Sequence, residues 1–153
     1  MGNKTDNFFS KQQLRLNLML WFRLSRFYNQ SIRESNIHLK EWNLTGSQFD
    51  ILAQIGTNER LSQQELADKL FVTKGNITQL ISKMEKNGLV KREQEWKTKY
   101  LSLTDKGLTL YHQVVPLQEQ FQAAQFESLN QQEKKVLLEL LRKIQRNSPR
   151  SKE

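Results

Sequence analysis

Residues 73–90 have the sequence TKGNITQLISKMEKNGLV, and this stretch decides the fold. Its apolar residues recur at three- and four-residue steps, the spacing of one helix face: Ile77, Leu80, Ile81 and Met84. The side-chain oxygen of Thr73 can cap the first turn, and Gly88 stands where the helix should stop. The stretch therefore predicts a helix over Thr73–Asn87.

The other side of this predicted helix is polar and basic. Its members are Lys74, Asn76, Thr78, Gln79, Ser82, Lys83 and Lys86. Glu85 is the single acidic residue, and Gly75 leaves the first turn unobstructed. Amides can pair with adenine, ammonium groups with guanine or phosphate, and a threonine methyl with a thymine methyl. This face suits the major groove of DNA, although on an isolated helix a merely solvated face would be the better interpretation.

Two shorter helices are predicted before this one, each opened by a capping box. The boxes are TGSQ at residues 45–48 and SQQE at residues 62–65, and both precede apolar residues. They predict helices over Thr45–Gly56, where Gly56 would stop the first helix, and over Ser62–Leu70. Only residues 71–72 separate the second of these from the next helix, which is the spacing of a helix-turn-helix.

An alternating pattern follows the three helices. Leu89–Glu93 and Lys99–Leu103 have the period-two alternation of strands, and Gln94–Thr98 lies between them as a turn. A helix-turn-helix followed by a two-stranded hairpin is a winged helix.

Long helical segments flank this winged helix. The segment from about Asn7 to Asn36 has a wide apolar stripe, which fits contact with both its own domain and a second subunit; one buried helix in a monomer is the alternative. Thr104 opens another helix, with a kink expected at Pro116. An amphipathic helix then ends near Arg146. The predicted fold is mostly α, with about six helices and a two-stranded wing.

The expected domain boundaries follow from these elements. Residues 1–36 form an N-terminal dimerisation helix, 37–104 a winged helix-turn-helix DNA-binding domain, and 105–146 two C-terminal dimerisation helices. The polar tail, 147–153, is expected to be disordered.

The composition favours a polyanionic partner. Hydrophobic residues are 37% of the 153, and with the 6 glycines the apolar share is about 41%, below the roughly 45–50% typical of globular domains. Such a small apolar share suggests a small hydrophobic core, and therefore an elongated shape or a core completed by a second subunit. The formal charge is +8, and the segment 69–99 holds eight basic residues against three acidic ones. This clustering is typical of a DNA-contacting face.

The sequence also excludes several classes of protein and of functional site. Without cysteine there can be no disulfide scaffold, thiolate metal site or thiol redox sensor. No apolar run approaches a membrane span, and no secretory signal is present, so the expected location is the cytoplasm. His38 and His112 are far apart, and no catalytic or phosphate-binding motif occurs, so we expect neither an enzyme nor a metal or cofactor. The alternatives left open are a winged-helix protein-interaction module, whose basic face would meet an acidic protein or a membrane, and a non-specific nucleoid-type DNA binder.

Three motifs together resemble the MarR family of bacterial transcription regulators, over roughly Leu14 to Ile144. LTxxQFxIL at residues 44–52 resembles the opening of that family's second helix. Residues 73–90 resemble its recognition helix and entry to the wing, and LTxxG at residues 103–107 resembles the exit from the wing. The resemblance implies a homodimer, a pseudo-palindromic operator, and release by a small aromatic or phenolic effector.

Two sets of candidate residues follow. The residues expected to contact DNA are Ser62, Gln63, Thr73, Lys74, Asn76, Thr78, Gln79, Lys83, Lys97 and Lys99. An effector pocket, implied by the resemblance, would lie between the winged domain and the dimer helices. Its candidates are Trp21, Phe22, Arg23, His38, Trp42 and Phe49, although aromatic residues at helical spacing are more often plain core.

The tip of the wing departs from the family pattern. The family usually carries an acidic-Arg-Arg run there, whose arginine enters the minor groove. Here the hairpin is shorter and its tip has the sequence EWKTK at residues 95–99, without arginine. Lys97 and Lys99 are then left to touch phosphates. We expect Trp96 to fold back on the hairpin, the alternatives being contact with sugar or with another chain.

Overall fold

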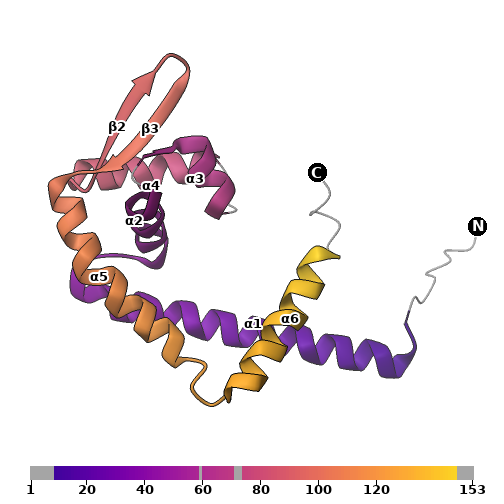
Figure 1. Ribbon diagram of the computed structural model, residues 1–153. Coiled ribbons are helices and arrows are strands. Elements are labelled where there is room, and N and C mark those ends of the chain that lie inside the picture. The colour runs from indigo at the N-terminus through magenta and orange to yellow at the C-terminus, as the bar shows by residue number, and fades with distance from the viewer. Residues whose placement is uncertain (1–8, 59, 71–73, 148–153) are drawn as a thin grey trace, which may run out of the picture. The chain divides into compact units, whose positions relative to one another are not determined.

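The computed structural model describes residues 9–58, 60–70 and 74–147 (Figure 1). The chain divides into two compact units, Met1–Gly46 and Ser47–Glu153. Within the described ranges it forms six α-helices, one short 3-10 helix and a three-stranded antiparallel sheet. The prediction of a mostly α winged helix-turn-helix is confirmed. None of the helices in these ranges is both long enough and apolar enough to cross a membrane.

The first unit consists mainly of α1 (Lys11–Leu39). Its capping box was not predicted: the Ser10 hydroxyl accepts from the Gln13 backbone N–H (3.2 Å), and the Gln13 side chain accepts from the Ser10 N–H (3.0 Å). The predicted end of this helix, at about Asn36, is too early. With no glycine or proline to stop it, the helix continues to Leu39 and passes into the 3-10 helix η1 (Lys40–Trp42).

Three helices open the second unit: α2 (Gly46–Asn58), α3 (Gln63–Leu70) and α4 (Lys74–Lys86). Their apolar residues form the core as the periodicity predicted. The fully buried members from these helices are Ile51, Leu52, Ile55, Leu66, Ile77, Ile81 and Met84.

Gly56 does not end α2, as the sequence had suggested, because the helix continues to Asn58. The glycine serves close packing instead. A Cβ at Gly56 would lie 2.3 Å from Cδ2 of Tyr111, which comes from the helix α5 (Asp105–Ala124). The Tyr111 ring therefore lies directly on the α2 backbone, and the next residue, Thr57, lies within hydrogen-bonding distance of the Tyr111 hydroxyl (3.3 Å).

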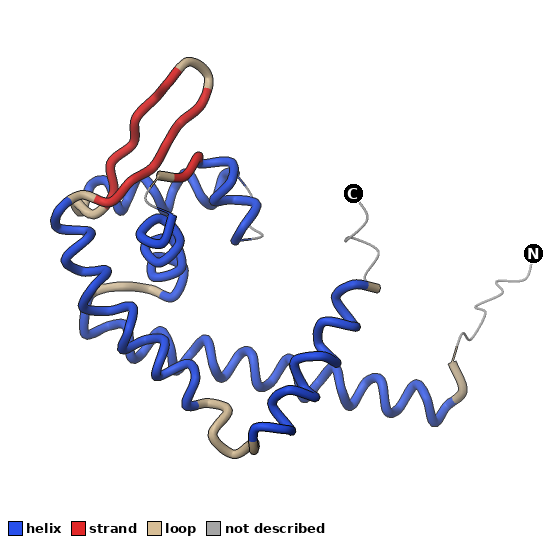
Figure 2. Tube along the Cα trace, in the orientation of Figure 1, coloured by secondary structure: helices blue, strands red, loops and turns tan. Residues whose placement is uncertain are grey.

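The sheet has the strand order β1-β3-β2. The wing strands are β2 (Val90–Glu95) and β3 (Thr98–Leu103), and their hairpin extends beyond α3 and α4 (Figure 2). The third strand, β1 (Leu61–Ser62), was not predicted; it pairs antiparallel with β3, Leu61 opposite Leu101. Two residues are too few to carry a periodic signal.

The wing turn is shorter than predicted. Glu95 pairs with Thr98, so only Trp96 and Lys97 connect the strands, where a turn over residues 94–98 was expected. The expectation that Trp96 folds back on the hairpin is wrong, because its side chain is 97% exposed. A two-residue turn points this side chain away from both strands.

Helix α5 begins in close contact with the base of the wing. The Thr104 hydroxyl accepts from the Gly107 N–H (3.0 Å) and donates to the Gly88 carbonyl (2.5 Å). A Cβ at Gly107 would lie 2.0 Å from the Leu89 carbonyl oxygen, so only glycine permits this approach. The helix continues through Pro116, and α6 (Gln131–Arg146) follows, opened by a capping box of Asn130 and Glu133.

Candidate nucleic-acid interface

Helix α4 has two chemically distinct faces. Ile77, Ile81 and Met84 are fully buried. The polar side chains are exposed on the other face: Asn76, Thr78, Gln79, Ser82, Lys83 and Lys86. Thr73 lies outside the described residues, and for Lys74 only the backbone is described. The exposed face therefore retains the amides, hydroxyls and ammonium groups that the sequence singled out.

A hydrogen bond between α3 and α4 links two of the predicted residues. Gln63 Nε2 donates to Thr78 Oγ1 (2.9 Å). Gln63 Oε1 is buried, and no residue in the described parts of the chain donates to it. This contact fixes the orientation of the Thr78 side chain at the start of the exposed face.

Ser62 caps the start of helix α3. Its hydroxyl accepts from the Glu65 N–H (3.1 Å), and the Glu65 carboxylate accepts from the Ser62 N–H (2.8 Å). The Ser62 backbone N–H, the Ser62 hydroxyl and the charge of Lys69 together lower the pKa of Glu65. Ser62 therefore positions the start of α3, and Gln63 follows it on the exposed side.

A hollow of about 300 Å³ lies between the helix-turn-helix and the wing. It gathers residues from three separate parts of the sequence. Its lining consists of Ser62, Gln63, Gln64, Ile77, Thr78, Lys97, Thr98 and Lys99. The structure thus brings Gln63 and Thr78 together with Lys97 and Lys99, whereas Asn76, Gln79 and Lys83 lie on α4 outside this hollow.

Two arginines have partners that sequence reasoning missed. The Arg92 guanidinium donates to the carboxylate of Glu85 and to the Ser82 hydroxyl (3.3 Å). Arg60 forms an ion pair with Glu95, and its guanidinium lies 3.9 Å from the centre of the Tyr100 ring. Arg92 is one of the eight basic residues counted in segment 69–99, but its guanidinium bonds within the fold. Because Arg92 and Glu85 lie in different elements, the spacing of residues along the sequence does not predict their pairing.

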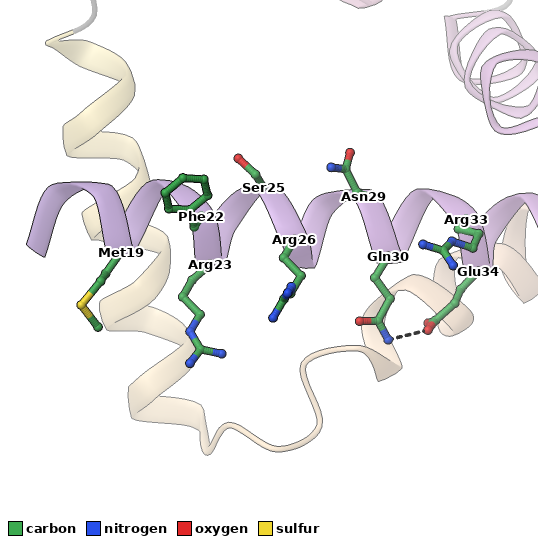
Figure 3. A pocket seen from close by; sticks show the side chains of 9 residues that line it. All are labelled: Met19, Phe22, Arg23, Ser25, Arg26, Asn29, Gln30, Arg33 and Glu34. Carbon is green, nitrogen blue, oxygen red and sulfur yellow. Dashed lines mark hydrogen bonds between the residues drawn. The ribbon is translucent and has the colours of Figure 1, made fainter. Parts of the chain in front are cut away.

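A second hollow, of about 870 Å³, runs along α1 (Figure 3). Nine side chains of this helix line it: Met19, Phe22, Arg23, Ser25, Arg26, Asn29, Gln30, Arg33 and Glu34. Of the predicted effector residues, only Phe22 and Arg23 are among them.

The other predicted effector residues have different environments. The His38 and Trp42 rings lie edge to face, with 5.3 Å between their centres. Trp21 is exposed on α1, and Phe49 is a buried side chain of α2, as plain core residues are. The basic side chains Arg26 and Arg33 of the second hollow were not singled out by the sequence.

These features define a winged helix-turn-helix protein with an exposed polar recognition helix. A family model described as the MarR family matches residues 42–95. A helix-turn-helix-type transcriptional regulator of Bacillus cereus is 44% identical over 131 residues, which is 85% of this chain and 89% of the relative. The regulator YkoM of Bacillus subtilis is 34% identical over 116 residues, 74% of this chain and 73% of its own. The chain belongs to the MarR family of helix-turn-helix transcriptional regulators.

Solved structures agree with this assignment. A MarR family transcriptional regulator from Listeria monocytogenes, in complex with 26mer DNA, has a TM-score of 0.74 and 28% identity, covering 83% of this chain and 87% of that one. The regulator SlyA shares the fold, with a TM-score of 0.76 at 22% identity over 84% of this chain and 92% of its own. The relatives are regulators of transcription, so the expectation that the chain is not an enzyme is confirmed.

Proposed function

We propose that this regulator binds a pseudo-palindromic operator as a homodimer and represses transcription in the cytoplasm. The observation that carries the proposal is the division of α4 into an apolar face, on which Ile77, Ile81 and Met84 are fully buried, and an exposed face of amides, hydroxyls and lysines. The major groove admits an α-helix and presents a distinct pattern of donors and acceptors for each base pair. The relative solved with 26mer DNA supports duplex DNA as the partner.

The exposed groups of α4 divide into two roles. The amides of Asn76 and Gln79 can make paired hydrogen bonds to a base edge, and the Thr78 methyl can meet a thymine methyl. Lys83 has only donors and a flexible stem, so it suits phosphate oxygens, as do Lys97 and Lys99 beside the hollow of the wing. Base-edge contacts then give sequence preference, and the lysines give affinity.

Exposed apolar side chains on α1 and α6 support the homodimer. In α6 none of the sixteen residues is buried, and Leu140 and Ile144 are 53% and 62% exposed. In α1, Trp21, Phe22 and Tyr28 are likewise exposed. Apolar surfaces of this kind mark sites of protein association. We therefore assign residues 1–36 and 105–146 to dimerisation, with half-sites about one helical turn, roughly 10 bp, apart.

The hollow along α1 supports regulation by a small aromatic anion. Phe22 offers a ring, and Arg23, Arg26 and Arg33 offer positive charge to a carboxylate or phenolate. Such an effector releases DNA only if it binds the DNA-incompetent form of the dimer more tightly than the competent form.

A gel-shift experiment tests the proposal. The labelled duplex is the promoter region upstream of the gene that encodes the chain, at about 50 and about 200 mM salt, with and without excess random-sequence competitor. A shift that survives the competitor and weakens steeply with salt supports specific binding. A shift that the competitor abolishes indicates a non-specific nucleoid-type binder. No shift at low salt overturns the DNA-binding role and favours a protein-interaction module.

A further inference from the structure

Trp96 has a backbone conformation that favours glycine. It is the first of the two residues between β2 and β3, and its φ is 56°, while Lys97 has no positive φ. That combination is typical of a type II′ turn, in which the first central position is usually glycine. A bulky residue with positive φ is a true outlier. Gln94 Nε2 supports the turn by donating to the Trp96 carbonyl (3.1 Å).

No packing within the described structure compensates for this conformation. The Trp96 side chain is 97% exposed, the largest exposed fraction among the large hydrophobic residues of the described chain. The turn stands at the far end of the hairpin (Figure 2). Strained backbone and an exposed aromatic side chain both oppose stability, and strained residues of this kind cluster at ligand-contacting sites.

The surroundings of Trp96 are cationic. Lys97 and Lys99 are exposed, and the carboxylate of the adjacent residue, Glu95, is paired with Arg60. The same two lysines line the hollow shared with Thr78 of α4, so the tip of the wing is continuous with the exposed face of that helix. A duplex bound by α4 would therefore meet the tip of the wing beside the bound major groove.

The chemistry of the indole indicates which base pairs it would prefer in the minor groove. Its ring is apolar, and its Nε1–H donates but cannot accept a hydrogen bond. In the minor groove A·T pairs present only the acceptors adenine N3 and thymine O2, whereas G·C pairs add the guanine N2 amino donor. An indole in this groove is therefore matched to A·T pairs and opposed by guanine.

We propose that Trp96 contacts the minor groove next to the base pairs that α4 binds, with its ring against deoxyribose and its Nε1–H toward the acceptor edge of A·T pairs. The inference rests on the proposed DNA-binding function and goes beyond it by giving this side chain a role in sequence preference. Lys97 and Lys99 hold the adjoining phosphates. Because the indole is uncharged, its share of the affinity is not screened by salt.

The experiment compares Trp96→Gly, Trp96→Phe and the native chain on a duplex that the native chain selects from a random-sequence pool. Trp96→Phe is the matched control, because it keeps an aromatic ring at the tip but loses the Nε1–H donor. We expect Trp96→Gly to bind about tenfold more weakly, the size of one lost aromatic stacking contact, with an unchanged salt slope. Its melting temperature should be no lower than that of the native chain, because glycine accepts positive φ.

Hydroxyl-radical footprinting, which detects sugars, locates the contact. Trp96→Gly should lose only the outermost protected sugars of each half-site. Replacing flanking A·T pairs by G·C should weaken the native chain and leave Trp96→Gly unaffected, and inosine in place of those guanines should restore native binding. Trp96→Phe should bind between the two and show a reduced A·T preference.

The outcomes separate the two proposals. If the native chain selects no duplex, the proposed function fails. If the native chain binds, but Trp96→Gly binds within about twofold of it and protects the same sugars, this inference alone fails. A loss of self-association in Trp96→Gly without a change in DNA affinity per dimer would also overturn it, because the indole would then contact another protein.

Discussion

The guanidinium of Arg92, in the first strand of the wing, donates to the carboxylate of Glu85 in the last turn of α4. Both side chains are partly buried, and Ser82 accepts a further bond from the same arginine. The contact joins the recognition helix directly to the wing. The angle between the two is therefore fixed by an ion pair as well as by the chain connection at Gly88.

Replacing Arg92 by alanine should destabilise the chain by about 1–2 kcal/mol, since a partly buried carboxylate loses its donor. Unfolding in urea measures this loss. Arg92→Lys is the matched control, because it keeps the charge but not the planar fork. In a double-mutant cycle with Glu85→Gln, a coupling free energy near zero would contradict the structural role of the pair.

Gln79→Ala and Lys97→Ala should have different effects on DNA binding. Gln79→Ala should relax base preference, costing about 1–3 kcal/mol on the best site and little on random DNA. Lys97→Ala should weaken binding to all sequences and flatten the salt slope by about one unit. Titrations of specific and random duplexes at several salt concentrations measure both. Equal losses on the two duplexes for both variants would refute this division.

Gly56→Ala should destabilise the chain by about 1–3 kcal/mol through overpacking, because the new methyl group would collide with the Tyr111 ring. Gly75→Ala is a matched control in α4, where a Cβ meets nothing within 4 Å, and it should stabilise by up to about 1 kcal/mol. Thermal unfolding compares the two. If Gly56→Ala were as stable as the native chain, the close contact with Tyr111 would be wrong.

Stability should depend on the charge of Glu65 in a defined direction. Its folded pKa is lowered, first by the Ser62 N–H and then by the Ser62 hydroxyl, so the carboxylate stabilises the folded chain above its ordinary pKa of 4.5. That contribution is lost as the pH falls through the lower, folded pKa. Compared with Glu65→Gln, the native chain should be more stable at pH 6 and lose this advantage on acidification. Urea unfolding across this range checks the sign, and an advantage that grew on acidification would contradict it.

Leu140→Glu should shift the proposed dimer toward monomer, since a charge would stand in the exposed apolar stripe of α6. Sedimentation measures the change in mass. Glu139→Lys, at the neighbouring exposed position, tests whether any charge change in α6 has this effect. An unchanged mass for Leu140→Glu would remove α6 from the interface.

Helical periodicity was enough to predict the three helices that precede the wing. The spacing of Ile77, Ile81 and Met84 defined both faces of α4, because each face depends only on residues three and four apart. The same reasoning failed where a residue's role depends on a distant partner. Gly56 resembled a helix stop, but the position of Tyr111, 55 residues later, gives it another role.

The sequence predicted the exposed residues of the candidate interface but not how the wing joins them. Exposed amides and lysines of α4 followed from its periodicity, while their joining with Lys97 and Lys99 around one hollow depends on how the wing returns to the helices. The pairing of Arg92 with Glu85 was missed because it removes a cation from the surface without leaving a local pattern. Trp96 was misplaced because turn length, which sets the direction of its side chain, depends on strand register.

Gly107, in the first turn of α5, lies close to the carbonyl of Leu89, which follows α4. Leu89 donates its N–H to the Met84 carbonyl at the end of α4 (3.0 Å) and accepts from the Thr104 N–H before α5 (3.1 Å). Leu89 therefore connects the end of α4 to the start of α5 through its own backbone hydrogen bonds. A tilt of α5 would therefore also move the end of α4, and in the proposed homodimer it would change the distance between the two recognition helices.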